Sequence, residues 1–479
     1  MENLHAPILK ILLPFALGIA LQGHYAQPLL YSISLLITLL LIYLVRPKSL
    51  FLYLATLLVG YTSAGIARGS APLEERENVI ITVQFNEGSD AKIIAMQDAN
   101  GRERQCRHRV IASTLDVDNH CIATVRANIK PFESDASDYH RAMRRRGYRV
   151  SVRVAEVLST SEQCKPLGMR LNEWAFERLN RLPLTRSSAA TAAAMALARR
   201  EGLPKEITES YSRSGTSHIM ALSGLHLGVI VVLISAVTCL LSLLHRGYLV
   251  ANVFSIATIW LFALMAGAGE SLIRASLMFT IAQLASLIAR RNFSLNSLLL
   301  SALAILCVDP LALYDLGLQL SFIAVAAILM VGVPVSQTIA TPKAALNLLL
   351  SSITIGLAAT VATIPLLSYT FGHFSLIAPL ATLPLLLSLS LIIYISILWI
   401  LFPIGFLAPI VGYVLELIVT VQNYMVTLFA ESNYGYISFK ISSLGLVVSY
   451  AILIVVAVLI SKWAAKQNRE KEDKILSYT

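Results

Sequence analysis

The sequence predicts an all-α polytopic membrane bundle of about 12 transmembrane helices, with one small β domain outside the cytoplasm. Hydrophobic residues make up 56% of the 479 positions and charged residues only 14%, against roughly 25% charged residues in soluble domains. The charges are also unevenly spread, because residues 218–461 carry 11 of them whereas residues 68–186 carry 36. This distribution excludes a single soluble globular protein, and it excludes a peripheral protein with one anchor.

Three spans precede the charged insertion. A hydrocarbon core of about 30 Å requires about 20 mostly apolar helical residues, and the segments that meet this rule are roughly 6–23, 28–45 and 50–67. Lys10 lies in the first span, near its end, where the ammonium group can reach the membrane surface. A second span follows at once and no small-residue cleavage site ends the first, so we expect the first span to be retained.

Nine further spans follow the insertion. They are expected at 218–243, 250–267, 271–289, 294–308, 317–335, 345–369, 375–401, 405–430 and 441–461.

Basic residues in the short loops predict the orientation. Under the twelve-span assignment, the loops with Arg46, Arg246, Arg290 and Lys343 and the charged tail 462–479 fall on one side of the membrane. The short loops on the other side have few or no basic residues. Both termini are therefore expected in the cytoplasm and the charged insertion outside.

The insertion, residues 68–186, reads as a small β domain. Short β-branched segments separated by turn sequences occur at 79–83, 91–96, 108–112 and 121–129, and residues 148–157 alternate with period two. Residues 135–146 are expected to form a helix before the last strand. Several strands with one interposed helix fit an OB-fold-like barrel, although periodicity alone does not separate it from other small β domains.

Two arginine clusters in the insertion are candidate DNA-binding residues, since such clusters can follow a phosphate backbone. Their members are Arg102, Arg104, Arg107 and Arg109, and Arg141, Arg144, Arg145, Arg146 and Arg149. The alternative is a solvated face whose charge is largely balanced by acidic residues, because the insertion has a net charge of only +4. Tyr139 and Tyr148 are candidates for stacking on bases.

Three cysteines lie in the insertion. Cys106 and Cys121 are on consecutive predicted strands in an oxidising compartment, so a disulfide is one expectation. Cys164 is the competing partner, and three unpaired thiols are the alternative. Residues 187–217 then read as surface helices that connect the insertion to the channel-like part, with a break at 202–204.

The fourth span opens with the run His218-Ile-Met-Ala-Leu-Ser223-Gly224-Leu-His226-Leu-Gly228. Ionisable groups inside a membrane are rare and usually face a cavity, while Gly224 and Gly228 permit close approach of another helix. Ser223 and His226 at i, i+3 could also belong to a membrane-embedded hydrolase, although no oxyanion motif accompanies them. A zinc site would require the fold to bring His218, His226, His373 and Asp315 together, and we expect neither metal nor cofactor.

The remaining polar residues of the apolar part gather at predicted outer ends of spans. Glu270 and Arg274 are spaced i, i+4 and can pair on one helix face. The further candidates for a channel vestibule are Asp309, Asp315, Gln319, Ser321 and His373.

Five divisions of the chain follow from these patterns. They are three transmembrane helices (1–67), the extracytoplasmic OB-like domain (68–186), the connecting helices (187–217), the transmembrane channel domain (218–461) and a cytoplasmic tail (462–479).

The run from His218 to Gly228 resembles the ComEC family of bacterial competence proteins. The segments 269–278, 309–322 and 371–377 resemble further segments of that family, and 137–147 is similar to the end of its external OB-like domain. The resemblance implies an inner-membrane channel that admits single-stranded DNA during natural transformation, and not an enzyme.

The resemblance also implies partners. No nucleotide-hydrolysis motif is present, so a DNA-delivery protein outside and a motor or helicase in the cytoplasm are expected. Many family members continue into a metallo-β-lactamase-like domain; this sequence ends at Thr479 without one, so a nuclease is expected in trans. A homo-oligomer is left open. The alternative function is a transporter of a lipid or small polar solute.

Overall fold

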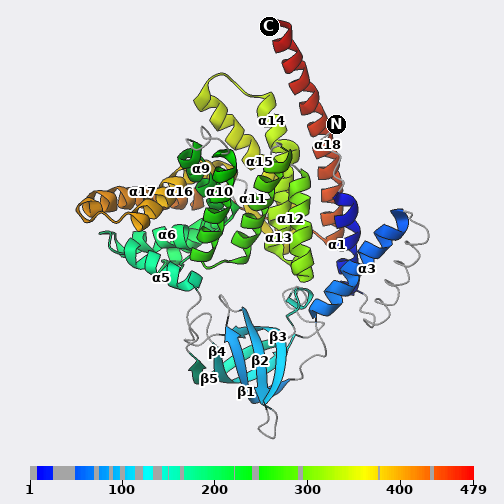
Figure 1. Ribbon diagram of the computed structural model, residues 1–479, viewed down its shortest axis with the longest axis vertical. Helices are drawn as coiled ribbons and strands as arrows, with labels where there is room; N and C mark the ends of the chain where they lie inside the picture. The colour runs from blue at the N-terminus through cyan, green and yellow to red at the C-terminus, as the bar shows by residue number, and fades with distance from the viewer. Residues whose placement is uncertain are drawn as a thin grey trace. The chain divides into compact units, whose positions relative to one another are not determined.

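The computed structural model describes residues 8–24, 49–68, 75–85, 90–97, 103–113, 122–132, 143–148, 150–161, 167–220, 222–239, 247–289, 295–375, 378–431 and 436–478. They belong to two compact units, whose elements are labelled in Figure 1. The barrel unit comprises Ala6–Leu167 and Ala302–Gln319, and the helical unit comprises Gly168–Ser301 and Leu320–Thr479.

Five strands of the barrel unit form a closed barrel. They are β1 (Arg76–Phe85), β2 (Asp90–Gln97), β3 (Glu103–Ser113), β4 (Ile122–Pro131) and β5 (Val150–Ser161). The order is β1-β2-β3-β5-β4, and pairing of β1 with β4 closes the barrel. Only β3 and β5 run parallel. All five predicted strands are therefore present.

Alternating side chains fill the barrel. Every second residue of β4 is buried, as the period of two requires, and Ile81, Ile93, Val125 and Val152 are among the core residues. Of the helix expected at 135–146, residues 143–146 are described; residues 143–145 are helical and Arg146 lies in a turn.

Beside the barrel, the described part of the barrel unit includes two apolar helices and a short 3-10 helix. Helices α1 (Leu9–His24) and α3 (Ser49–Arg68) pack through Gly18 and Gly60, where any Cβ would collide with the backbone of the other helix. The 3-10 helix η3 (Pro310–Tyr314) is joined to α1 because the Tyr314 hydroxyl donates to the carbonyl oxygen of Ile19 at 3.0 Å. The span expected at 28–45 lies outside the described residues.

The helical unit contains the remaining helices. They are α5 (Leu167–Leu179), α6 (Arg186–Leu197), α7 (Lys205–Arg213), α8 (Ser217–Met220), α9 (Gly224–Thr238), α10 (Gly247–Met265), α11 (Glu270–Ala289), α12 (Leu295–Val308), α13 (Leu316–Ala327), η4 (Ile328–Gly332), α14 (Val333–Thr338), α15 (Ala344–Thr370), α16 (Ala378–Leu401), η5 (Gly405–Leu407), α17 (Ala408–Ala430) and α18 (Ser443–Tyr478). Helices α12 and α13 continue into the barrel unit.

Among the described residues, six helices are long and apolar enough to cross a membrane, so the expected twelve are not established. These are Gly247–Met265, Leu316–Thr338, Ala344–Thr370, Leu380–Leu401, Gly405–Ala430 and Ser443–Asn468. Four shorter apolar helices of 10–17 residues occur at Leu9–Gln22, Leu52–Ala67, Gly224–Thr238 and Leu295–Val308. Helix α11 coincides with the expected span 271–289, but polar residues such as Glu270, Arg274 and Gln283 interrupt its apolar surface.

The fourth expected span, 218–243, is broken. Ser223 is extended, with φ −131° and ψ 176°, and α8 and α9 lie on either side of it. Ser223 binds the first amides of α9 as an N-cap, which ends any helix arriving from the other side.

Helix α6 is buried, although the sequence predicts a surface helix here. Residues 190–197 are all buried, and α6 contacts α16 and α17. The small alanine side chains leave room for neighbouring helices to approach on every face, which explains the difference.

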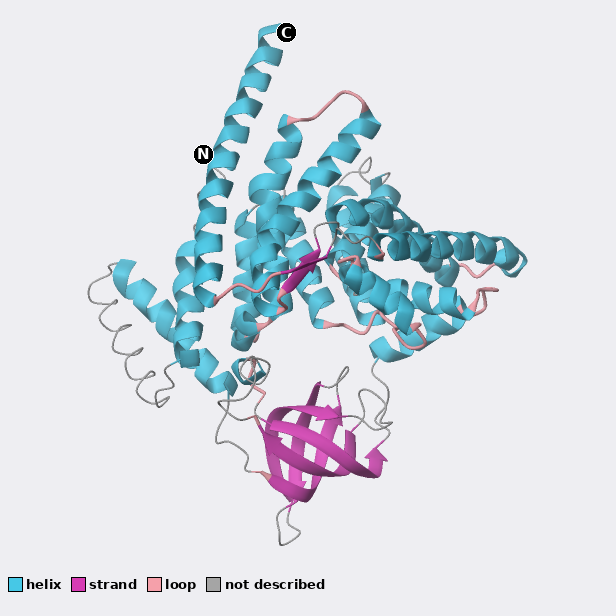
Figure 2. Ribbon diagram, turned by 180° about the vertical axis from the view of Figure 1, so that it is seen from behind, coloured by secondary structure: helices cyan, strands magenta, loops and turns pink. Residues whose placement is uncertain are grey.

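A two-stranded ribbon links distant parts of the helical unit. Strand β6 (His373–Ser375) pairs antiparallel with β7 (Tyr436–Ser438), with His373 opposite Ser438. Figure 2 shows this ribbon among the helices.

Candidate functional site

The turn between α8 and α9 contains three of the predicted channel residues. The Ser223 amide and the Ser223 hydroxyl both lie 3.3 Å from Nδ1 of His226, and the Ser223 oxygen accepts from the amide of Leu225. His226 is fully buried and His218 is exposed. The contacts of Ser223 and His226 are those of a helix capping box, which is a structural function rather than an arrangement for hydrolysis.

The fold brings β6 against the same region. The Ser375 hydroxyl donates to the carbonyl oxygen of Ser214 at 3.3 Å, just before α8. Gly215 lies so close to Ser375 that an added Cβ would be 2.6 Å from the Ser375 Cβ. Two clusters that are about 150 residues apart in the sequence, the α8–α9 run and the segment with His373, therefore meet in one place.

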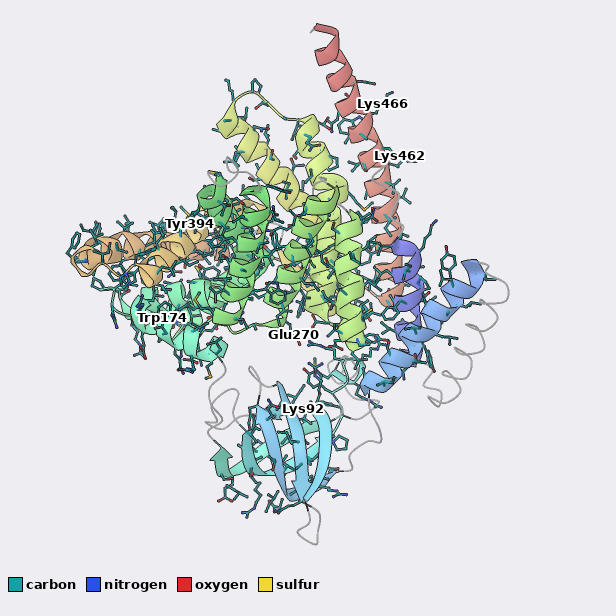
Figure 3. The ribbon with its side chains drawn as sticks, viewed as in Figure 1. Lys92, Trp174, Glu270, Tyr394, Lys462 and Lys466 are labelled. Atoms are coloured by element: carbon teal, nitrogen blue, oxygen red, sulfur yellow. The ribbon has the colours of Figure 1, made fainter. Side chains whose placement is uncertain are left out.

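The two glycines of helix α9 face α11, although the helices are not so close there that a Cβ would be excluded. A Cβ at Gly224 would lie 3.5 Å from Ala275, and one at Gly228 would lie 3.8 Å from Phe279. On α11, Arg274 is buried and its guanidinium is 3.9 Å from the carboxylate of Glu270, so the predicted pair forms. Figure 3 shows Glu270 at the start of α11, and Tyr394 of α16, whose hydroxyl donates to the Val229 carbonyl of α9. Ser321 of α13 is half-buried.

The other predicted channel residues lie in the barrel unit, where two of them bind arginines. Asp309 Oδ2 is 3.5 Å from a guanidinium nitrogen of Arg109, and Asp315 Oδ2 is 2.6 Å from one of Arg146. Gln319 donates to the carbonyl oxygen of Leu313. The 309–315 segment therefore contacts the arginine clusters instead of being an independent acidic site.

Tyr148 is not available for stacking on bases. It is 5% exposed, and the guanidiniums of Arg109 and Arg146 lie 5.1 Å and 5.9 Å from the centre of its ring. The expectation failed because a tyrosine beside arginines can be a platform for them as well as for a base.

The remaining arginines fall into three groups. Arg144 and Arg145 are exposed. Arg104 and Arg107 lie in β3, but their side chains are outside the described part of the structure. Arg102, Arg141 and Arg149 lie outside the described residues, as does Tyr139.

The expected disulfide stays a prediction. Cys121 and Cys164 are outside the described residues, and only the backbone of Cys106 is described, in β3. Strand β5 lies between β3 and β4 in the barrel, so strands that are consecutive in sequence are not neighbours here.

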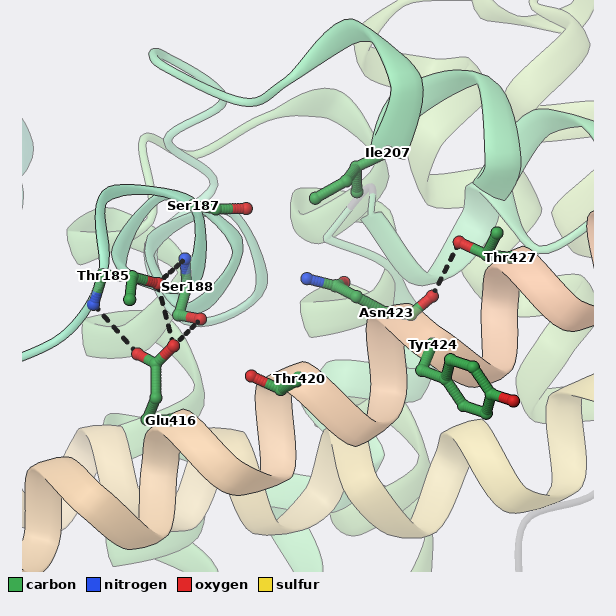
Figure 4. A pocket seen from close by; sticks show the side chains of 9 residues that line it. All are labelled: Thr185, Ser187, Ser188, Ile207, Glu416, Thr420, Asn423, Tyr424 and Thr427. Carbon is green, nitrogen blue, oxygen red and sulfur yellow. Dashed lines mark hydrogen bonds between the residues drawn. The ribbon is translucent and has the colours of Figure 1, made fainter.

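A polar pocket on α17 was missed by the sequence reasoning. Glu416 accepts bonds from the Thr185 amide, the Thr185 hydroxyl and the Ser188 hydroxyl, at 2.8–2.9 Å. These bonds hold the start of α6 against α17, beside a pocket of about 380 Å³ (Figure 4). The pocket is lined by Thr185, Ser187, Ser188, Ile207, Glu416, Thr420, Asn423, Tyr424 and Thr427. One acidic residue within an apolar run was the available signal.

A buried polar pair also joins α17 to α7. The Gln422 amide donates to the Tyr211 hydroxyl at 3.0 Å, and both side chains are buried. Burial raises the pKa of the Tyr211 phenol, so it remains protonated at neutral pH.

The long apolar helices and the sparse, mutually bonded polar groups between them define a multi-pass membrane protein. The chain belongs to the competence protein family, whose model matches residues 195–463. It is 27% identical over 272 residues to ComE operon protein 3 of Bacillus subtilis (strain 168), a stretch that covers 56% of this chain and 32% of that protein. The match therefore spans about a third of the relative's length. No solved structure matches the chain.

Proposed function

We propose that this protein is the channel through which single-stranded DNA crosses the bacterial cytoplasmic membrane during natural transformation. The observation that carries the proposal is the family match over residues 195–463, which include the α8–α9 turn, the Glu270–Arg274 pair, the 309–315 segment and β6. These are the segments in which the few polar residues of the apolar part are concentrated.

The barrel is proposed to receive the DNA outside the cell membrane. Its five strands, their order and their closure support an OB-type barrel, in which the second and third strands form the usual face for oligonucleotides. Lys92 of β2 stands opposite Arg109 of β3, and Arg104 and Arg107 also belong to β3, so these two strands are rich in basic residues. The barrel lies outside residues 195–463, so its function rests on this geometry and charge.

The proposed orientation places both termini in the cytoplasm, as the loop charges predict. Translocation then requires a delivery protein outside and a motor in the cytoplasm. A separate nuclease would degrade the strand that is not transported. We assign no catalytic step to this chain.

The proposal is tested by deletion of the gene in a transformable host. Cytosolic recombinants from marked linear DNA should be lost, while nuclease-protected DNA outside the cytoplasm should accumulate normally. Electroporation of the same DNA into the deletion strain serves as the control for recombination. Unchanged recombinant numbers after natural transformation would refute the proposal.

The role of the barrel is tested by complementation of that strain. Arg144→Gln combined with Arg145→Gln removes two exposed charges from the arginine cluster, and we expect fewer recombinants. The control is Arg153→Gln, an exposed arginine on β5, which should leave transformation near the wild-type level. Equal effects of the two sets would argue against a DNA-binding function of the cluster.

A further inference from the structure

Two arginines of the proposed DNA-binding surface are already occupied by carboxylates from the same unit. Arg109 of β3 pairs with Asp309, and Arg146 of the 143–148 turn pairs with Asp315. The side chains of the first pair are 35% and 43% exposed, and those of the second are 25% and 11% exposed. The first pair therefore lies at the surface of the unit, where a soluble anion can reach it, whereas in the second pair Asp315 is buried and Arg146 is the more exposed member.

A shared aromatic ring fixes both arginines. Arg109 and Arg146 lie over Tyr148, and Arg109 also donates to the Tyr148 hydroxyl at 3.4 Å. The turn is held directly against η3, because a Cβ at Gly147 would lie 2.6 Å from Leu311. Two guanidiniums are thus held side by side, facing one acidic segment.

The two carboxylates divide their oxygens between two tasks. Oδ1 of Asp309 accepts from the Leu311 amide at 3.0 Å, and Oδ1 of Asp315 accepts from the Leu318 amide at 2.7 Å. Oδ2 of each residue binds the arginine. An arginine can therefore leave without loss of the bond that caps η3 or α13.

A guanidinium binds carboxylate and phosphate oxygens with the same donor geometry. We propose that the carboxylates of Asp309 and Asp315 occupy Arg109 and Arg146 in place of DNA phosphates, until single-stranded DNA displaces these carboxylates. This inference rests on the proposed DNA-binding function of the barrel. The Arg109–Asp309 pair is exposed, and exposed ion pairs are weak, whereas a strand offers several phosphates and releases counterions on binding, so DNA can exchange with Asp309. At the second pair a phosphate would approach from the side of Arg146, its more exposed member. Exchange there removes one link between the 143–148 turn and the 309–315 segment and leaves the packing of Gly147 on Leu311.

The test measures DNA affinity of the full-length protein in lipid nanodiscs. Fluorescence anisotropy of a labelled oligothymidylate of about 20 nucleotides, long enough to cover one OB-type barrel, gives the dissociation constant. The variants are Asp309→Asn and Asp315→Asn, in which the amide oxygen retains the cap while the negative charge is removed. The matched control is Glu156→Gln, which removes one charge from the Arg126–Glu156 pair (2.7 Å) between β4 and β5.

Each aspartate variant should bind the oligonucleotide about three- to fivefold more tightly than wild type, the scale of one weak ion pair. The control carries the same change in net charge but leaves Asp309 and Asp315 in place. It should stay within about twofold of wild type, because salt screens the long-range effect of a surface charge. Arg146→Gln should weaken binding in the wild-type background and abolish the gain in Asp315→Asn.

The outcomes separate this inference from the function on which it rests. If all the proteins bind DNA and Glu156→Gln gains as much affinity as the aspartate variants, the proposed displacement of the carboxylates is wrong. The DNA-binding function of the barrel would then still stand. Binding that is insensitive to Arg146→Gln overturns it as well. No binding by any protein at low salt overturns both the inference and the DNA-binding function of the barrel. Matching gel-filtration profiles establish that the variants are folded.

Discussion

Substitution of Gly215 by alanine tests the junction between the α8–α9 region and β6. The backbone at Gly215 has φ +74°, a conformation that costs an alanine roughly 1 kcal/mol. The new Cβ would also lie 2.6 Å from Cβ and 3.0 Å from Oγ of Ser375, and relief of such a contact in a packed site costs about 1–3 kcal/mol. Together the two effects predict a loss of about 2–4 kcal/mol in the free energy of unfolding.

Gly202 provides a matched control. Its φ is +79°, but an added Cβ would have only the Ala190 Cβ near it, at 4.0 Å. Gly202→Ala should therefore lose about 1 kcal/mol from the backbone conformation alone. The difference between the two variants isolates the steric contacts with Ser375 of β6 and Ala378 of α16.

The assay is reversible unfolding in mixed micelles, followed by circular dichroism, with a double-mutant cycle. Ser375→Gly removes two of the three atoms that the new Cβ at position 215 would meet, including the nearest, while the Ala378 Cβ at 3.0 Å remains. The double variant should therefore be about 1–2 kcal/mol more stable than additivity predicts. If Gly215→Ala and Gly202→Ala agree within about 0.5 kcal/mol, or if the cycle is additive, the close packing of β6 on this turn is wrong.

Three further predictions concern other contacts. Ser223→Ala should lower stability by about 1 kcal/mol because the N-cap is lost, and Ser223→Asn should retain most of that stability. Cells with either variant should still be transformable, and loss of transformation with two well-assembled variants would favour the hydrolase alternative. Gly60→Ala should separate α1 from α3 at a cost of about 2 kcal/mol, because the new Cβ meets the Phe15 carbonyl; a stability equal to wild type in the same titration would contradict this packing. Glu416→Ala removes three hydrogen bonds and should lower the free energy of unfolding by about 3 kcal/mol, and Glu416→Gln should lower it less. Thr420→Ala, in the same pocket, should change it by less than about 0.5 kcal/mol. Equal losses at both positions would show that the bonds to α6 are unimportant.

Local patterns were sufficient to predict the strands and most of the apolar helices. Alternation along β4 and the turn sequences between strands depend only on nearby residues, and each predicted strand overlaps its described counterpart over most of its length. Gly224 and Gly228 both face α11, as residues four positions apart on one helix face should, but the space there would also accept a Cβ at either position.

The break before α9 was not predictable from hydropathy. Residues 219–243 are mostly apolar, and Ser223 could have bonded within a continuous helix as readily as it caps one. In the structure the turn before α8 packs against Ser375, a residue about 150 positions away. The local sequence around Ser223 therefore does not contain all the contacts that favour a break over a continuous helix.

Long-range pairing explains the other differences. Arg109 and Asp309 are 200 positions apart, and no local pattern indicates that a predicted DNA-binding residue and a predicted channel residue bind each other. In the same way, Glu416 was visible as an isolated charge, but its partners at Thr185 and Ser188 were not.

The pairing of the barrel strands has a mechanical consequence. The chain enters the barrel at Arg76, opposite Ile129 of β4, and leaves at Ser161, opposite Ile122 of the same strand. These points are seven residues apart along β4, about 24 Å at 3.4 Å per residue, so the two connections emerge near opposite ends of the barrel. A force applied through the two connections would therefore pass through the barrel from one end to the other. Tension between its two connections would act along the strands in shear, where many ladder bonds resist together, instead of opening them one at a time.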